Sequence, residues 1–442
     1  MENPCHMCMP MGGILALKGI EQAMVIVHGS QGCSTYMRRH IAEHFNEPVD
    51  VGSSSLNEKG TVYGGEANLC KALDNIRKVY QPELIGVVTT CLAETIGEDI
   101  ARIVTDYRQE RQLTMPIVTA NTPGYGGNHS EGYWLTVRRL VETLATASES
   151  HNKVNVIIPS ISPADIREIK RLLAAMKLEY TLLPDISDTL DRPYLATYSK
   201  LPAGGTAIAD LCRLGGAPAT IEFGITLSDN VSPGKYLKDT FGVPLYSLPL
   251  PIGIENTDTF IRALETISGR KCPADIEIER GRLLDGMIDS HKYNFAGRSA
   301  VFGEPELVYA VTQLCLENGI RPIVVTGDKN GNVLRLLPKT ELSAETVVLD
   351  DPDFDLVELH VKVGKVNIAI GHSDGRFLTE KHNIPLVRLG FPIHDRVGGQ
   401  RLLSVGYTGS MLLIDRITNT LLTEKYTHYR EDMYKKYYSK SS

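Results

Sequence analysis

The segment Ala23-Met-Val-Ile-Val-His28-Gly-Ser-Gln-Gly-Cys33 decides the fold class of this chain. Its first part is an apolar run rich in β-branched residues, which is typical of a strand buried on both faces of a parallel sheet. The Gly-Ser-Gln-Gly turn then leads into a helical pattern over residues 35–45. A buried strand followed by a glycine turn and a helix is the repeating unit of parallel α/β folds.

Apolar runs of the same kind recur along the whole chain and fall into three blocks. We predict strands at residues 84–90 and 116–120, then 153–159, 220–224 and 244–248, and finally 299–303, 322–327 and 366–371. A long charged helix is expected over residues 275–292, and a terminal helix with a frayed end over residues 425–442. The sequence therefore predicts an α/β protein with parallel sheets flanked by helices. Its three domains are expected at residues 1–150, 151–272 and 273–442.

Composition excludes several classes of function. Of 442 residues, 42% are hydrophobic and 22% are charged, as in soluble globular proteins. The net charge of −7 provides no basic excess for nucleic acid. Neither an apolar run long enough to span a bilayer nor a signal peptide is found, and eight cysteines in so long a chain do not indicate a disulfide framework. We therefore expect a cytoplasmic protein.

Three cysteines lie where this fold class binds ligands. Cys33 and Cys91 follow predicted strands of the first block, and Cys8 lies in a Gly/Pro-containing segment before the first helix. Ligands bind at the carboxyl ends of parallel strands, and thiolates suit iron–sulfur clusters, zinc or copper. Neighbouring glycines are expected to let the backbone approach a bulky ligand closely; they are Gly12, Gly13, Gly29 and Gly32.

Two other interpretations of these cysteines stay open at this point. Cys5-His-Met-Cys8 is a C-x-x-C motif, but no second knuckle follows, so a zinc or redox site is only weakly indicated. Cys33 and Cys91 are also compatible with small packing residues. If all three thiols bind a cluster, the cluster is under-ligated, and the simplest remedy is that a partner chain supplies the remaining ligands.

Other polar residues near these motifs have a structural and a functional interpretation. His28, Ser30 and Gln31 border the cysteine loop, where hydrogen bonds to sulfur would tune a cluster. Glu94 and Asp99 are expected to open the helix after Cys91, as caps or as a docking site for a partner. The remaining cysteines are interpreted as structural; they are Cys70, Cys212, Cys272 and Cys315.

Two histidines and two glycines have weaker signals. His40 and His44 are one helical turn apart, a spacing that suits a metal, although a solvated or partner-facing helix is favoured. The strand-end residues Gly303 and Gly371 suggest a dinucleotide fold. Neither belongs to a G-x-G-x-x-G motif, and no P-loop occurs, so we do not expect this chain to bind nucleotides.

These motifs together resemble one family, the β-type subunit of nitrogenase component 1 and of nitrogenase-like reductases. The resemblance covers nearly the whole chain. It rests on these segments: Cys8-Met-Pro-Met-Gly12, Val27-His-Gly-Ser-Gln-Gly-Cys33, His44-Phe-Asn-Glu-Pro48, Thr89-Thr-Cys-Leu-Ala-Glu94, Pro251-Ile-Gly-Ile254, Arg388-Leu-Gly-Phe-Pro392 and Gly406-Tyr-Thr-Gly409.

The resemblance implies three Rossmann-like domains in a subunit of an α2β2 heterotetramer. It also implies a P-cluster, an [8Fe-7S] electron relay, at the interface with a homologous α-type subunit. Cys8, Cys33 and Cys91 would supply the ligands from this chain. An ATP-dependent iron protein with a [4Fe-4S] cluster would deliver electrons, which pass to a catalytic iron–sulfur cofactor in the α-type subunit. The implied substrates are dinitrogen, methylthio compounds or tetrapyrroles.

Two features limit what the resemblance implies. The family's serine that ligates the oxidised P-cluster is matched here by Gly124, so the redox-switching role of that serine is absent. Residues 220–228 contain no cysteine where the α-type subunit has its cofactor ligand, so the catalytic cofactor is not expected in this chain.

The alternative function is a scaffold subunit for cofactor assembly with an interfacial [4Fe-4S] cluster. A third is a structural subunit without metal.

Overall fold

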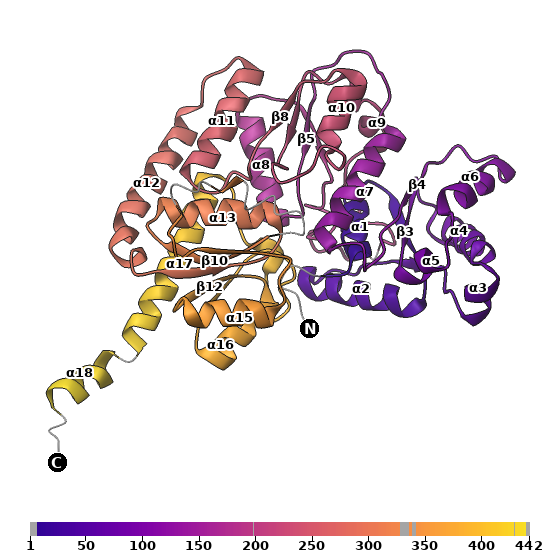
Figure 1. The fold of residues 1–442 in the computed structure, drawn as a ribbon. Coiled ribbons are helices and arrows are strands. Elements are labelled where there is room, and N and C mark those ends of the chain that lie inside the picture. The colour runs from indigo at the N-terminus through magenta and orange to yellow at the C-terminus, as the bar shows by residue number, and fades with distance from the viewer. Residues whose placement is uncertain (1–6, 198, 328–335, 338–341, 428, 439–442) are drawn as a thin grey trace.

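The computed structural model describes residues 7–197, 199–327, 336–337, 342–427 and 429–438. Three parallel β-sheets lie one after another along the chain, each flanked by helices (Figure 1). The predicted α/β class with three parallel sheets is confirmed. The strands of each sheet fall inside one predicted domain, whereas the domain boundaries at residues 150 and 272 stay predictions.

The first sheet has the strand order β2-β1-β3-β4. Along β1, Val25 and Val27 face the central core, while Met24 and Ile26 face a separate outer core. This alternation places helices on both faces of the sheet. The strands are β1 (Ala23–His28), β2 (Gly52–Ser53), β3 (Leu84–Thr89) and β4 (Ile117–Ala120). The helices are α1 (Met9–Lys18), α2 (Gln31–Phe45), α3 (Glu58–Tyr63), α4 (Glu66–Tyr80), α5 (Cys91–Thr95), α6 (Ile100–Glu110) and α7 (His129–Leu144).

The second sheet has the order β6-β5-β7-β8. Its first helix begins as the sequence predicts: Ser162 accepts a hydrogen bond from the amide of Asp165, and Pro163 occupies the first turn. The strands are β5 (Val154–Ile157), β6 (Tyr180–Leu183), β7 (Thr220–Glu222) and β8 (Leu245–Ser247). The helices are α8 (Pro163–Ala175), α9 (Ile208–Cys212), η1 (Leu214–Gly216), α10 (Pro233–Phe241) and α11 (Ile254–Ser268).

The third sheet has the order β11-β10-β9-β12-β13. The helix α17 begins inside the third domain, where it packs along α12, and its C-terminal end leads into α18, which projects from the body of the molecule (Figure 1). The strands are β9 (Arg298–Val301), β10 (Arg321–Gly327), β11 (Val347–Asp350), β12 (Ile368–Gly371) and β13 (Leu386–Arg388). The helices are α12 (Ala274–Asn294), α13 (Pro305–Glu317), α15 (Phe354–Val363), η2 (Ser373–Gly375), α16 (Arg376–His382), η3 (Gly399–Arg401), α17 (Gly406–Thr427) and α18 (Tyr429–Tyr437).

One hydrophobic core joins the three sheets. It runs from Ile14 in α1 through Val156 in β5 to Ile370 in β12. Two smaller cores lie under α4 and α6 and under α15. Burial of apolar surface drives folding, so a shared core fixes the sheets relative to one another. This fixed arrangement holds the loops at the strand ends in place.

Four of the observed strands were not predicted from the sequence: β2, β6, β11 and β13. All four are edge strands, which pair on one side only and therefore need no uniform apolar run. The predicted terminal helix is confirmed as α18, and residues 439–442 of the predicted frayed end lie outside the described residues. No helix in the described part of the chain is both long and apolar enough to cross a bilayer.

Candidate metal centre

Three helix starts bring thiols to one end of the first sheet. Cys8 is the residue that precedes α1, Cys33 lies in the first turn of α2, and Cys91 is the first residue of α5. The strands β1 and β3 are parallel neighbours, so the helices that follow them begin at the same sheet edge. The sequence places the start of the second helix at residue 35, but α2 begins at Gln31, so Cys33 is helical.

The sulfurs of Cys8 and Cys91 converge on Gly124, in the loop after β4. A Cβ atom added to Gly124 would lie 2.7 Å from the Sγ of Cys8 and 3.1 Å from the Sγ of Cys91. The amide of Gly124 donates a hydrogen bond of 3.2 Å to the Sγ of Cys91. Cys8 is held from the other side by a β-bridge to Asn128. A side chain at position 124 would therefore occupy the space between two thiols.

The chemistry of this site fits thiolate-bound metal. Burial, together with the neighbouring thiols of Cys91 and Cys33, raises the pKa of Cys8 to about 11. Bound metal cations would overcome this penalty, because they deprotonate the thiols that coordinate them. Within the described residues no three His, Cys, Asp or Glu side chains are arranged to hold a single ion.

The thiols are not enclosed by this chain. Cys8 and Cys33 are half-buried, and Cys91 is exposed. A buried iron–sulfur cluster needs about four or more ligands and a dry surrounding. Because the thiols are accessible from outside, a second chain can reach them and supply further ligands.

Hydrogen bonds beside Cys91 tie the ends of two strands together. The carboxylate of Glu94 accepts hydrogen bonds from the hydroxyl of Thr89 (2.5 Å) and from the side-chain Nδ2 of Asn121 (2.6 Å). Asp99 caps α6 by accepting from the amide of Arg102 (3.0 Å). The two carboxylates begin two successive helices instead of one: Glu94 lies in the first turn of α5, as predicted, and Asp99 caps α6. Glu94 also braces the loop that carries Gly124.

Of the three polar residues predicted to border the cysteine loop, one contacts a cysteine. The hydroxyl of Ser30 lies 3.4 Å from the Sγ of Cys33 and donates to it. His28 is buried, bonds Ser54 at 2.9 Å, and its Nε2 lies 3.8 Å from the carboxylate of Glu98. Gln31 is exposed, and its carbonyl accepts the hydroxyl of Ser34 (2.9 Å).

The expectation that four glycines make room for a ligand is wrong for three of them. Gly12 packs against the backbone of His129, Gly13 against Val88, and Gly29 against Thr90. Their small size serves the packing of α1 on α7 and of one strand end on another. Gly32 borders open space, with the Ser30 hydroxyl as its nearest neighbour at 3.9 Å.

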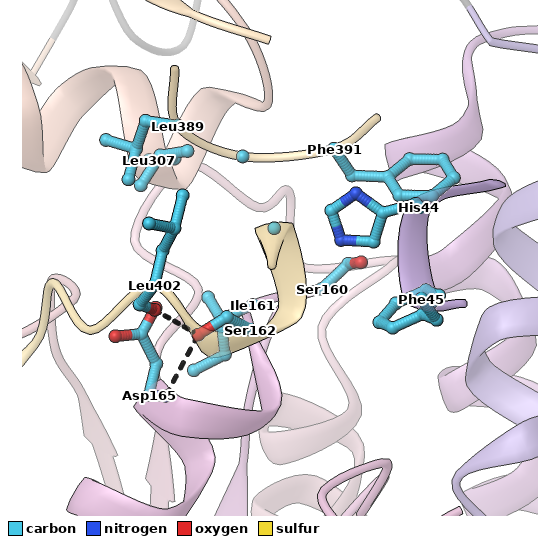
Figure 2. Close-up of a pocket in the computed structure, with 12 residues that line it drawn as sticks. His44, Phe45, Ser160, Ile161, Ser162, Asp165, Leu307, Leu389, Phe391 and Leu402 are labelled. Atoms are coloured by element: carbon cyan, nitrogen blue, oxygen red, sulfur yellow. Dashed lines mark hydrogen bonds between the residues drawn. The ribbon is translucent and has the colours of Figure 1, made fainter. Parts of the chain in front are cut away.

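The histidine pair does not form the metal site or the solvated face that its spacing suggests. His44 is buried, its Nδ1 accepts the amide of Ile393 at 2.8 Å, and burial lowers its pKa to about 3. Figure 2 shows its ring beside Phe391 in a pocket between the sheets. The free volume there is about 30 Å³, roughly the volume of one water molecule. His40, by contrast, stays half-buried at the surface of α2.

The remaining cysteines lie away from this centre. Cys315 is buried in the core, which confirms its structural role. Cys70 packs against the outer core of the first sheet, and Cys272 packs against the central core. Cys212 ends α9. Cys5 of the C-x-x-C motif lies outside the described residues.

The sequence analysis missed the role of Asn128. Besides pairing with Cys8, Asn128 and Glu131 form a reciprocal capping box at the start of α7. The signal is visible in the sequence, because Asn and Glu stand three residues apart before an apolar helical pattern. This cap holds α7, and α7 in turn packs along α1, the helix that begins after Cys8.

Comparisons with known proteins agree with this geometry. Residues 8–422 match the family described as nitrogenase component 1 type oxidoreductase. The nitrogenase molybdenum-iron protein beta chains of Methanococcus maripaludis and Clostridium pasteurianum are each 37% identical to this chain. They cover 96% and 95% of it, and the matches span 95% and 93% of those chains. The nitrogenase vanadium-iron protein beta chain of Trichormus variabilis is 32% identical over 97% of this chain and 96% of its own length.

A solved structure shows the same fold. "Nitrogenase Cp1 at pH 6.5" superimposes with a TM-score of 0.91 at 36% identity, covering 96% of this chain and 94% of that one. A more distant chain, from "Nitrogenase Cp1 at pH 5", has a TM-score of 0.71 at 15% identity and shows the fold alone.

Proposed function

Because this chain belongs to the nitrogenase component 1 type oxidoreductase family and is a β-type subunit of it, we propose that its cysteines hold an interfacial P-cluster. Cys8, Cys33 and Cys91 are the proposed ligands of the [8Fe-7S] group. A homologous α-type subunit would supply the other ligands in an α2β2 heterotetramer. The observation that carries the proposal is the convergence of two sulfurs on Gly124, at an open edge of the first sheet.

The residues of this chain would have separate roles in that site. The three thiolates would fix the cluster, and the N-termini of α2 and α5 would favour their negative charge. The hydroxyl of Ser30 and the amide of Gly124 would donate to sulfur, which raises the reduction potential of a cluster. When bound, the group supplies one-electron redox chemistry at the subunit interface.

Two partners are proposed for this chain, one that donates electrons to the cluster and one that receives them. An ATP-dependent iron protein with a [4Fe-4S] cluster would deliver electrons, and the α-type subunit would hold the catalytic iron–sulfur cofactor. Dinitrogen or another small substrate, such as a methylthio compound, would be reduced there. We place the complex in the cytoplasm. No nucleic acid or membrane is part of the proposal.

The alternative function is a scaffold subunit for cofactor assembly, with a [4Fe-4S] cluster at the interface. Two sulfurs that converge on Gly124, with the thiol of Cys33 close enough to act on the pKa of Cys8, favour the larger group, because more sulfur ligands from each chain suit a larger cluster. The two functions differ in iron content and in redox behaviour, so one preparation separates them.

The experiment is anaerobic co-purification with the α-type subunit, followed by iron analysis and electron paramagnetic resonance. A P-cluster predicts about eight irons per αβ pair beyond the cofactor, a silent reduced state, and signals after stepwise oxidation. About four irons with an S = 1/2 signal on reduction would favour the scaffold. Iron-protein-dependent turnover of dinitrogen and of a methylthio compound would then identify the substrate. A complex without iron would refute both functions.

A further inference from the structure

A pocket of about 190 Å³ lies where segments that follow strands of all three sheets meet. Its walls come from the loop between β4 and α7, from the loop between β7 and α10, and from the start of α13, which follows β9. Ligands of parallel α/β folds bind beyond the carboxyl ends of strands and between domains, and this pocket has both properties. We call it the Trp134 pocket. Its apolar wall consists of Met9, Trp134, Leu135, Leu227, Val231 and Pro305.

Trp134 brings an unused hydrogen-bond donor to this apolar wall. It is the only tryptophan of the chain, and its side chain is 2% exposed. Within the described part of the chain, its indole N–H makes no hydrogen bond. The Nε1 atom is not among the unpartnered side-chain atoms that are completely enclosed, so it keeps accessible surface. A buried tryptophan usually finds a partner for this group, and the open space beside Trp134 is the pocket that it lines.

Asn128 and Ser130 add two further donors to the same pocket. They are 2% and 6% exposed, and both line it. The side-chain oxygen of Asn128 accepts the amide of Glu131 at 3.0 Å, which fixes the orientation of the group, but its Nδ2 donates to no described residue. The hydroxyl of Ser130 has no described partner either, and neither atom is completely enclosed. Three buried residues therefore present donors that lack an acceptor.

The charge in the lining decides which acceptor fits. Glu131 is the one charged residue among the described residues of the lining, and its Oε2 accepts the backbone amide of Asn128 at 2.7 Å. The hydroxyl of Thr226 is already donated to the buried Glu306 (2.6 Å). A carboxylate repels an anionic ligand, and a row of donors opposes a cationic one. The lining therefore suits an oxygen acceptor without charge.

The volume of the pocket sets the size of the ligand. A dry apolar cavity of about 150 Å³ holds benzene. The Trp134 pocket, at about 190 Å³, is therefore large enough for a six-membered ring with a short substituent. The indole of Trp134 and the thioether of Met9 both pack favourably against an aromatic ring.

We propose that the Trp134 pocket binds a small neutral molecule with a ring-sized apolar body and a carbonyl oxygen. The oxygen would accept hydrogen bonds from the unpartnered donors of the wall, and the body would lie against the apolar side chains. A buried donor without an acceptor is unfavourable, so satisfying these groups contributes to binding. The proposal does not depend on the P-cluster, because none of the three proposed cluster ligands lines the pocket.

The test is equilibrium dialysis of radiolabelled acetophenone against the intact purified complex. We expect one saturable site per copy of this chain. Ser228→Phe should abolish it, because Ser228 is an exposed residue of the lining where a larger side chain obstructs entry. Ser130→Ala should weaken binding roughly three- to tenfold, because one donor is lost. Ser150→Phe is the matched control and should bind normally, since Ser150 is also exposed but lies outside the lining.

Two charged analogues of similar size test the chemistry of the site. Benzoate carries a negative charge, and 1-phenylethylamine carries a positive charge at neutral pH and offers donors only. Each should displace acetophenone at least tenfold less well than unlabelled acetophenone does. Equal competition by benzoate would identify a general anion site, and equal competition by the amine would identify a cation site at Glu131. Either result would overturn the proposal.

Two other outcomes would also overturn it: the absence of saturable acetophenone binding, and full binding in both Ser130→Ala and Ser228→Phe. Both variants should keep the fold, because Ser228 is exposed and the hydroxyl of Ser130 bonds no described residue. A partner chain that closes the pocket would abolish binding and would count against the proposal. Iron content should be equal in all variants, so a failure of acetophenone binding leaves the proposed P-cluster untouched.

Discussion

The backbone of Gly124 lies against the sulfur of Cys8, so that a Cβ atom at position 124 would come within 2.7 Å of it. At that distance something must move, and the same atom would also crowd Cys91. Glycine at position 124 therefore keeps the space beside both sulfurs clear of a side chain.

Gly124→Val should lower the iron content of the purified complex to less than half, because its branched side chain would fill the space between the two thiols. Iron per chain, measured beside far-ultraviolet circular dichroism, tests this. The control is Gly281→Ala in α12, where a Cβ meets no atom within 4 Å. Equal iron in both variants would contradict the proposed position of the cluster.

Cys33→Ala and Cys91→Ala should each abolish the interfacial cluster and its paramagnetic signals while the chain stays folded. Cys33 is half-buried and Cys91 is exposed, so removal of either thiol does not open a fully enclosed cavity. Cys315→Ala is the opposite case: Cys315 is buried, so the substitution should lower stability and keep the iron. A full iron complement in both ligand variants would refute the assignment.

Gly12→Ala should destabilise the chain by at least about 1–3 kcal/mol, the usual cost of overpacking a core. The added methyl group would collide with the backbone of His129, and Gly132 makes the reciprocal contact with Met9. Urea denaturation with circular dichroism detection measures the loss. Gly281→Ala again serves as control, with an expected gain of about 0.5–1 kcal/mol for a helical position. An unchanged midpoint for Gly12→Ala would show that α1 and α7 are farther apart.

Glu306 should make the stability of the chain fall as pH rises. Its Oε1 accepts the amide (2.8 Å) and hydroxyl (2.6 Å) of Thr226, and burial raises its pKa to about 8. Between its ordinary value of 4.5 and 8, the unfolded chain releases a proton that the folded chain retains. The contribution of Glu306 to the free energy of unfolding is therefore complete below pH 4.5. It decreases between pH 4.5 and pH 8, by at most about 1.4 kcal/mol per pH unit.

Glu306→Gln removes this titration and keeps an acceptor for Thr226. The difference in urea midpoint between the variant and the parent should therefore grow in favour of the variant from pH 5 to pH 8. Glu380→Gln is the control, because Glu380 is exposed on α16. Parallel pH profiles for Glu306→Gln and the parent would show that Glu306 is ionised in the folded state.

The sequence by itself determined the fold class and the strand ends that Cys33 and Cys91 follow. Apolar runs such as residues 23–28 and 84–89 must be buried on both faces, which requires a parallel sheet with helices on each side. Cys33 and Cys91 follow two such runs, so their place at one sheet edge follows from local pattern alone. Edge strands such as β13 have no comparable signal, because pairing on one side tolerates mixed burial.

Only the tertiary structure decided what surrounds those cysteines. Gly124 and Asn128 come from a loop about 33 residues beyond Cys91, and their contacts with sulfur or with Cys8 depend on how β4 and α7 pack. The same holds for His44, whose burial against Phe391 links residues 347 positions apart. Helical spacing predicts which side chains share a face of one helix, but it does not show what packs against that face.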